Sequence, residues 1–233
     1  MKLCFLLVLL LWLKVELSAQ VAQPAGKLNV NTAPGGIVEE ILFDKIPERI
    51  GSHYLYDDWL TGNIYLKSGQ KVKEKPLKYD LQTQVIRIKF DGVVKALKVS
   101  KILRFELANA DGDNDLFINA DLFENDNTIM TGFFKVVEDG SLRLLSMTEL
   151  QLVKANYAPT HNAGEMSDRY VKTDRFYFEE EMDIFKVSKN KNKSLKFFGT
   201  QAESIKNFIS ENRLGFKKEQ DLIQIVKFYN SQN

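Results

Sequence analysis

The sequence predicts an α+β fold in which a predominantly antiparallel β-sheet precedes a C-terminal helical hairpin. Residues Gln84 to Phe90 alternate between apolar and polar side chains, which is typical of a half-buried strand. Asp91-Gly92 and Asp139-Gly140 each separate two strand patterns, and this dipeptide favours a two-residue hairpin turn. Towards the C-terminus the apolar residues recur at helical spacing instead. A sandwich and a partly closed barrel both remain open, because closure depends on register and strand tilt.

The first 19 residues have the three regions of a secretory signal peptide. Met1-Lys2 is positively charged, an apolar run of eleven residues extends from Leu3 to Leu13, and a more polar segment leads to Ala19. The run is shorter than the roughly 20 residues that a helix needs to cross a bilayer. We therefore expect residues 1–19 to be a cleaved leader, with cleavage after Ala22 or Ala25 left open. The mature chain is expected to be exported without a transmembrane span.

The mature chain would be neutral and free of cysteine. Loss of the leader takes two lysines and one glutamate from 32 basic and 31 acidic residues, which leaves equal numbers of each sign. Cys4 is the single cysteine, so the mature chain would have no disulfide, no thiol nucleophile and no cysteine metal ligand. A neutral chain of mixed charges gives no electrostatic reason to expect a nucleic-acid partner.

Composition divides the mature chain into three parts. Residues 20–50 are poor in large apolar side chains and contain Pro and Gly, which predicts a flexible or irregular segment, although its end could form a helical turn or an edge strand. Residues 51–190 carry the strand patterns of an antiparallel β domain. Residues 191–233 form a helical appendage, which we expect to pack on the sheet because two short amphipathic helices are not stable alone.

Ten strands are expected in succession. They cover Asn63–Lys67, Lys71–Tyr79, Gln84–Phe90, Val93–Val99, Ile102–Leu107, Leu116–Asn119, Thr128–Glu138, Leu142–Ala155, Arg169–Glu179 and Met182–Ser188. The last pair is expected to turn at Glu180-Glu181. In the appendage, Thr200 and Glu203 fit a capping box, and Gly215 is placed to end the first helix in a left-handed conformation. The second helix should run from about Lys217 to Asn230.

Short motifs are spread over most of the mature chain. They are Tyr54-Leu55-x-Asp57-x-Trp59, Gly62-x-Ile64-Tyr65-Leu66-x-x-Gly69, Pro76-Leu77-Lys78-Tyr79-Asp80, Gly132-Phe133-Phe134 before Asp139-Gly140, Lys217-Lys218-Glu219-x-Asp221-Leu222 and Phe228-Tyr229-Asn230. Together they resemble a family of signal-peptide-bearing proteins of Bacteroidota for which no activity is known. The resemblance implies export in a Gram-negative bacterium, to the periplasm, the outer envelope or the medium. It implies no cofactor and no catalytic residue.

The aromatic stretch from Gly51 to Tyr65 holds the candidate ligand contacts. A binding platform for a sugar-like ligand could draw on His53, Tyr54, Tyr56, Asp57, Trp59 and Tyr65. Asp57 and Asp58 are neighbours whose side chains would point to opposite faces of a strand, so they are not expected to form a glycosidase pair. The favoured alternative is that Trp59 and the tyrosines anchor the core and its rim.

Asp111, Asp113 and Asp115 form a weak candidate for calcium. Oxygen ligands at alternate positions suit this ion, but Leu116 and Leu122 replace the Gly and the bidentate Glu of the EF-hand loop. A solvated loop is therefore favoured, and no metal or cofactor is predicted. The two histidines, His53 and His161, stand in no His-Glu-x-x-His pattern.

These observations favour an exported cell-envelope protein that is a non-catalytic binding or structural module. Its partner would be an envelope component or a small ligand. The alternative is a hydrolase that acts on envelope glycans or esters through dispersed carboxylates or His53. Whether the protein is an enzyme stays open on the sequence alone.

Overall fold

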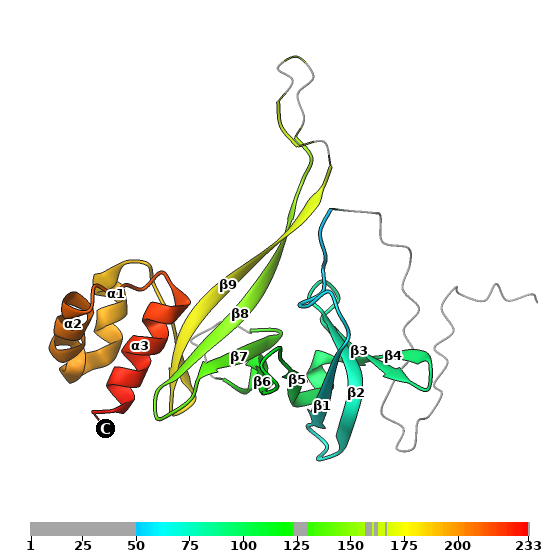
Figure 1. Ribbon diagram of the computed structural model, residues 1–233, viewed down its shortest axis with the longest axis horizontal. Helices are drawn as coiled ribbons and strands as arrows, with labels where there is room; N and C mark the ends of the chain where they lie inside the picture. Colours follow the sequence, from blue (N-terminus) through cyan, green and yellow to red (C-terminus); the bar gives the residue numbers. More distant parts are fainter. Residues whose placement is uncertain (1–49, 124–129, 157–159, 161–162, 166, 233) are drawn as a thin grey trace, which may run out of the picture.

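The computed structural model describes residues 50–123, 130–156, 160, 163–165 and 167–232. The predicted leader and residues 20–49 therefore lie outside the described residues, as does His161. Ten strands and a C-terminal group of helices make up the described part (Figure 1), and this confirms the predicted α+β class. No helix in these ranges is both long and apolar enough to span a membrane.

The strands follow the predicted succession. They are β1 (Leu60–Leu66), β2 (Lys71–Asp80), β3 (Val85–Phe90), β4 (Val93–Lys98), β5 (Ile102–Ala108), β6 (Asn114–Asn119), β7 (Phe133–Glu138), β8 (Arg143–Val153), β9 (Arg169–Glu180) and β10 (Asp183–Lys186). The helices are α1 (Lys191–Leu195), α2 (Ala202–Glu211) and α3 (Glu219–Asn230), with 3-10 segments η1 (Val99–Lys101), η2 (Ala120–Leu122) and η4 (Lys196–Gln201).

All ten strands belong to one antiparallel sheet in the order β10-β9-β8-β7-β6-β5-β1-β2-β3-β4. Neighbouring strands in this order are consecutive in the chain, except at the pairing of β5 with β1. The predicted turn at Asp91-Gly92 joins β3 to β4, with φ values of 47° and 83°. The sheet is open, because β10 and β4 stand at the two ends of this order and each pairs with a single described strand.

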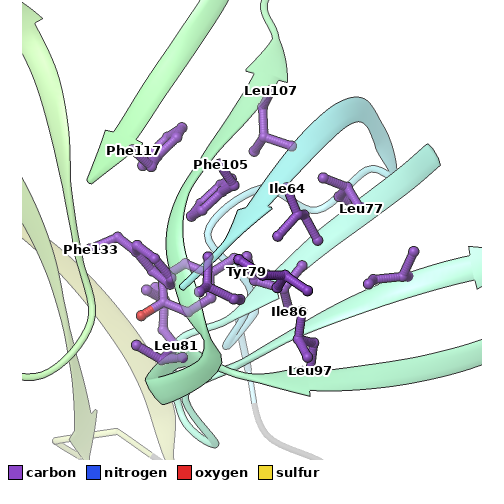
Figure 2. Packing of buried hydrophobic residues seen from close by; sticks show 14 residues of the cluster. Ile64, Leu77, Tyr79, Leu81, Ile86, Leu97, Phe105, Leu107, Phe117 and Phe133 are labelled. Carbon is purple, nitrogen blue, oxygen red and sulfur yellow. The ribbon is translucent and has the colours of Figure 1, made fainter. Parts of the chain in front are cut away.

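Successive side chains of a strand point to opposite faces, so the register assigns each residue to a face. We call the inner face the one that carries Ile86, Phe105, Phe117 and Phe133 (Figure 2). The ring of Phe105 stacks on that of Phe117 at 4.5 Å and meets that of Phe133 edge-on at 4.7 Å. These rings form the centre of the core over β1 to β7.

Helices cover the other end of the inner face. Leu144 of β8 and Phe178 of β9 are paired in the sheet, and both are fully buried. They pack in one cluster with Ile205 of α2 and with Leu222 and Ile225 of α3. The apolar stripe of each amphipathic helix is thereby removed from water. This packing stabilises helices that would be too short to be stable alone.

The outer face has a smaller cluster of its own. Phe134, Leu145 and Tyr177 alternate with the inner-face residues of β7, β8 and β9 and pack together with Phe123. The ring of Phe134 lies edge-on to the rings of Phe123 and Tyr177, at 5.4 and 5.0 Å. Strands β7 to β9 are therefore apolar on both faces near their helix-covered ends.

The last hairpin turns one residue later than predicted. Its turn residues are Glu181 and Met182, with φ values of 52° and 74°, and not Glu180-Glu181. The side chain of Glu179 accepts a hydrogen bond from the backbone N–H of Met182 at 2.9 Å. This bond helps two residues other than Gly to hold a turn that requires positive φ.

The predicted helix signals in the appendage are wrong in detail. Helix α2 has Gln201 at its N-cap with no side-chain capping bond, so the Thr200–Glu203 capping box does not form. Arg213, with a φ of 55°, takes the left-handed conformation after the helix. Gly215 instead donates its N–H to the carboxylate of Asp221 at 2.9 Å, and this bond joins the loop to the first turn of α3.

Candidate functional site

Residues 50–56, which we call the strap, join two distant strands of the sheet. Ile50 pairs in parallel with Arg169 of β9, and its carbonyl accepts the N–H of Tyr170 at 2.9 Å. Four residues later, Tyr54 pairs with Asp80 at the end of β2. Strands β9 and β2 have β8, β7, β6, β5 and β1 between them in the sheet. The strap can bond to both strands because the open sheet curls.

A cleft of about 430 Å³ lies between the strap and the inner face. Leu55 and Tyr56 of the strap form one side, and Phe117 and Phe133 of the core form its apolar floor. Leu150 of β8 packs against the same core from the opposite side. The cleft thus occupies the gap between the core over β1 to β7 and the helix-covered end of the same face.

The alternation of β8 and β9 explains where the cleft begins. Leu144 and Phe178 lie under the helices. On the same face, the following positions are Ser146 and Thr148 on β8, with Asp174 opposite Thr148 on β9, and these line the cleft. The inner face changes from apolar to polar along each strand, so the helices end and the cleft opens where the side chains become hydrophilic.

Asp115 organises the polar group nearest the apolar floor. Its Oδ2 accepts hydrogen bonds from Lys135 Nζ at 2.7 Å and from the Tyr56 hydroxyl at 3.2 Å, and its Oδ1 accepts one from Asn109 at 3.2 Å. Burial alone would raise the pKa of Asp115, but the bonds from Lys135 and Asn109 outweigh it and lower the pKa. Burial, followed by the charge of Asp115, raises the pKa of Tyr56 to about 12. Tyr56 therefore presents a neutral phenol to the cleft.

Strand β9 contributes the opposite rim. Lys172 Nζ donates to the carbonyl of Leu55 at 3.2 Å and lies 3.7 Å from Asp57 Oδ1, which ties the strap to β9 by a side chain. Thr148 donates its hydroxyl to Asp174 Oδ1 at 2.6 Å. Ammonium groups and carboxylates thus face the same cleft, so its net charge is small and its polar rim is rich in hydrogen-bonding groups.

A second polar cluster lies at the β2 end of the strap. Asp80 is fully buried and accepts the backbone N–H groups of Gln82 and Thr83 at 3.0 Å each, and Arg87 Nη2 at 3.2 Å. His53 Nε2 is 3.5 Å from Asp80 Oδ2 without hydrogen-bond geometry. Burial lowers the pKa of His53, and the opposing effect of Asp80 does not restore it.

His53 therefore belongs to the anchorage of the strap. Its ring lies against those of Tyr54 and Tyr170, with centroids 4.2 and 5.8 Å apart. The hydroxyl of Tyr170 in turn donates to Gln82 at 2.6 Å. His53 is not among the described residues that line the cleft.

Of the six predicted ligand contacts, Tyr56 is the one that lines the cleft among the described residues. The rings of Tyr54 and Trp59 lie next to lysine side chains on the outer face of β2 and β3. Lys78 Nζ is 4.5 Å from the centroid of the Tyr54 ring, and Lys89 Nζ is 4.3 Å from that of the Trp59 ring. Trp59 is partly exposed and lies outside the core, contrary to the interpretation of Trp59 as a core anchor.

The remaining two candidates are also away from the cleft. Asp57 has a side chain that is 75% exposed beyond the strap. Tyr65 lies on the outer face of β1, where Arg104 is 4.1 Å from its ring and Glu106 accepts its hydroxyl at 3.2 Å. The structure therefore divides the predicted aromatic platform between two faces of the sheet.

The weak calcium candidates do not converge. The backbone N–H groups of Asp111 and Asp113 both donate to the side chain of Asn109, at 3.1 and 3.0 Å, while Asp115 is bound to Lys135. Within the described ranges no group of three or more His, Cys, Asp or Glu side chains could hold a metal ion.

Sequence reasoning missed most of the cleft. Lys135, Thr148, Leu150, Lys172 and Asp174 carried no motif, and each is an ordinary strand residue in isolation. Alternation could have placed Thr148 and Leu150 on one face of β8, but only the curl of the sheet brings that face to the strap. Comparison of the chain with protein-family models, curated proteins and solved structures found no match.

Proposed function

We propose that the protein is an exported cell-envelope protein that binds a small amphiphilic ligand in the cleft and acts by binding and not by catalysis. The cleft carries this proposal. Its volume of about 430 Å³ is in the range of small-molecule sites, and an apolar floor with a few placed polar groups is the usual composition of such sites.

The chemistry of the rim selects the class of ligand. Lys135 is paired with Asp115 and Lys172 with Asp57, while Asp174 accepts a hydrogen bond from the Thr148 hydroxyl. A strongly charged ligand would have to break these pairs, whereas hydroxyl or amide groups can bond to them as they stand. We therefore infer a ligand with one apolar face and several hydroxyl or amide groups.

Filling the cleft tests this proposal. Thr148→Trp places a large ring on the inner face of β8, and Val94→Trp places the same ring on exposed β4 as the matched control. The probe is N-phenyl-1-naphthylamine, an uncharged amphiphile, and its binding is followed by fluorescence titration. The wild-type protein and Val94→Trp should bind it at one site, and Thr148→Trp should not. Equal binding by a folded Thr148→Trp variant would remove the cleft as the site.

Export is tested separately. The leader pattern of residues 1–19 and the resemblance described above support the proposal of an envelope location. Expression in a Gram-negative host, followed by fractionation and mass spectrometry, should give a chain that begins at Gln20 outside the cytoplasm. Leu7→Arg, in the apolar run, should leave the precursor uncleaved. A wild-type chain that stays full-length in the cytoplasm would contradict export.

A further inference from the structure

Strand β9 has an open stretch along the edge that faces away from β8. Strand β8 pairs with β9 from Arg169 to Glu179. On the other edge, Ile50 pairs at Arg169, and β10 pairs from Tyr177 onwards. Between these two contacts, residues 171–175 pair on this edge with no residue of the described part of the chain. The gap has the length of a short strand.

The backbone direction in the gap follows from its two ends. Tyr170 donates its N–H to Ile50, and Phe176 accepts at its carbonyl the N–H of Val187 at 2.9 Å, so both residues direct their backbone groups to the open edge. In an antiparallel strand this direction alternates with a period of two residues. Lys172 and Asp174 therefore direct their N–H and C=O groups to the same edge. Residues 172 to 174 are exposed, and no described residue pairs with these backbone groups.

A basic pocket lies beside the gap. Its volume is about 400 Å³, and Phe176, Val187 and Phe216 form its apolar part. Lys186, Lys189 and Lys217 line it as well. Lys189 and Lys217 form no ion pair with a described carboxylate. The lysines outnumber Asp174, the acidic residue that also lines the pocket, so the pocket has a net positive charge close to an unpaired strand edge.

We propose that β9 accepts an extended acidic segment of a partner protein as an additional strand along Val171–Arg175. Such strand addition derives affinity from backbone hydrogen bonds and specificity from pockets for alternate side chains. Here the backbone groups of Lys172 and Asp174 would form the hydrogen bonds, and the lysine-rimmed pocket would give the side-chain specificity. A carboxylate on the partner complements the three lysines. This site needs no ligand in the cleft, because it uses the backbone edge of β9 and the pocket near α3, whereas the cleft uses the side chains of Lys172 and Asp174.

The test uses a short, end-blocked peptide of alternating glutamate and valine, with two matched peptides. One replaces glutamate by lysine, and the other is N-methylated on the amides that would face β9. Hydrogen exchange of the full chain is followed by NMR. The acidic peptide should slow exchange at the amides of Lys172 and Asp174. Both matched peptides should bind at least about tenfold more weakly, because one loses charge complementarity and the other loses strand hydrogen bonds.

A pair of protein variants completes the experiment. Both variants lose the Asp174 carboxylate. Asp174→Pro also loses the backbone N–H that points to the open edge, while the hydrogen bonds between β9 and β8 remain. Asp174→Ala keeps this N–H and is the matched control. Asp174→Pro should bind the acidic peptide about tenfold or more weakly than Asp174→Ala. Equal binding by the lysine or N-methylated peptide would overturn the proposal. So would protection at β4 in place of β9, or protection of β9 that grows with protein concentration when no peptide is present.

Discussion

Asp80 shows how a single side chain determines the shape of the strap end. In the sequence, Asp80 is only the last residue of the motif that begins at Pro76, and His53 is a candidate ligand contact. In the structure Asp80 is fully buried, closes the turn after β2 and pairs with Arg87, and His53 lies against this pair. Neither role could be predicted, because burial of Asp80 depends on the strap, whose pairing with β9 is a long-range contact.

Removal of this carboxylate should destabilise the protein more than removal of its charge alone. Asp80→Ala removes the acceptor of one Arg87 hydrogen bond and of two backbone N–H groups, and we expect a loss of about 3 kcal/mol in the free energy of unfolding. Asp80→Asn keeps an acceptor for the turn and should lose less. Urea denaturation measures both changes. Wild-type stability in Asp80→Ala would show that the cluster contributes nothing.

The lowered pKa of His53 predicts a dependence of stability on pH. The unfolded chain binds a proton near the ordinary value of 6.5, whereas the folded protein binds it only at lower pH. The contribution of His53 is therefore complete above 6.5 and is lost as the pH falls through the folded-state pKa. Denaturation at about pH 7.5 and about pH 5.5 should show this decline. His53→Gln should reduce it, and an unchanged decline in that variant would place the titrating group elsewhere.

At the scale of elements, two motifs that are far apart in the sequence meet at the end of α3. Asn230 donates from Nδ2 to the carbonyl of Leu142 and accepts the N–H of Leu142 at Oδ1, both at 2.9 Å. Its Oδ1 also accepts the hydroxyl of Ser141 at 2.9 Å. A Cβ on Gly140, which has a φ of 150°, would lie 2.2 Å from Asn230 Nδ2. One side chain thus docks the last helix on the β7–β8 hairpin.

A double-mutant cycle tests this docking. Asn230→Ala should cost about 1–3 kcal/mol in the free energy of unfolding, because Leu142 loses both of its partners. Gly140→Ala should also destabilise, through the close approach to Asn230 and the positive φ. The double variant should lose less than the two single losses together, because Asn230→Ala removes the clash. If the losses of the two single variants add up to that of the double variant in thermal or urea unfolding, Asn230 and Gly140 do not interact.

Local patterns predict elements well where the chain neighbours alone decide the structure. The Asp91-Gly92 hairpin forms as predicted because its turn chemistry lies in two adjacent residues. The last hairpin is displaced because Glu179, a residue outside the turn, bonds to Met182. Gly215 does not adopt the left-handed conformation that would end α2, because its N–H donates a hydrogen bond to Asp221 in the next helix. Each error comes from a side chain that acts on a backbone group beyond the local pattern.

For the whole molecule, the curl of the sheet is the feature that the sequence conceals. The strand order follows mainly from hairpins, but the cleft needs Leu55, Phe133, Leu150 and Lys172 on one side of a curled surface. Curl depends on the twist and register of ten strands together, and no single segment specifies it. The cleft could therefore not be predicted from the fold class.

A disulfide between the strap and β9 should stabilise the curled sheet. A Cβ built on Gly51 would lie 3.7 Å from that of Tyr170, which suits a disulfide, although the φ of 85° at Gly51 adds strain. In a Cys4→Ser background, Gly51→Cys with Tyr170→Cys should be about 2–4 kcal/mol more stable when oxidised than when reduced. Comparison of the two redox forms of one variant cancels the lost Tyr170 contacts. Equal thermal midpoints in both forms would place the strap away from β9.

The two attachments of the strap also set an order of assembly. Its contacts with the end of β2 are made within one hairpin-sized segment, whereas Lys172 and Leu55 are 117 positions apart along the chain. Closing so long a loop is entropically unfavourable until the intervening strands have formed. The cleft is therefore a late product of folding. In a chain that is synthesised from its N-terminus, the strap precedes β9, and the strap segment stays exposed to chaperones and proteases until β9 has formed.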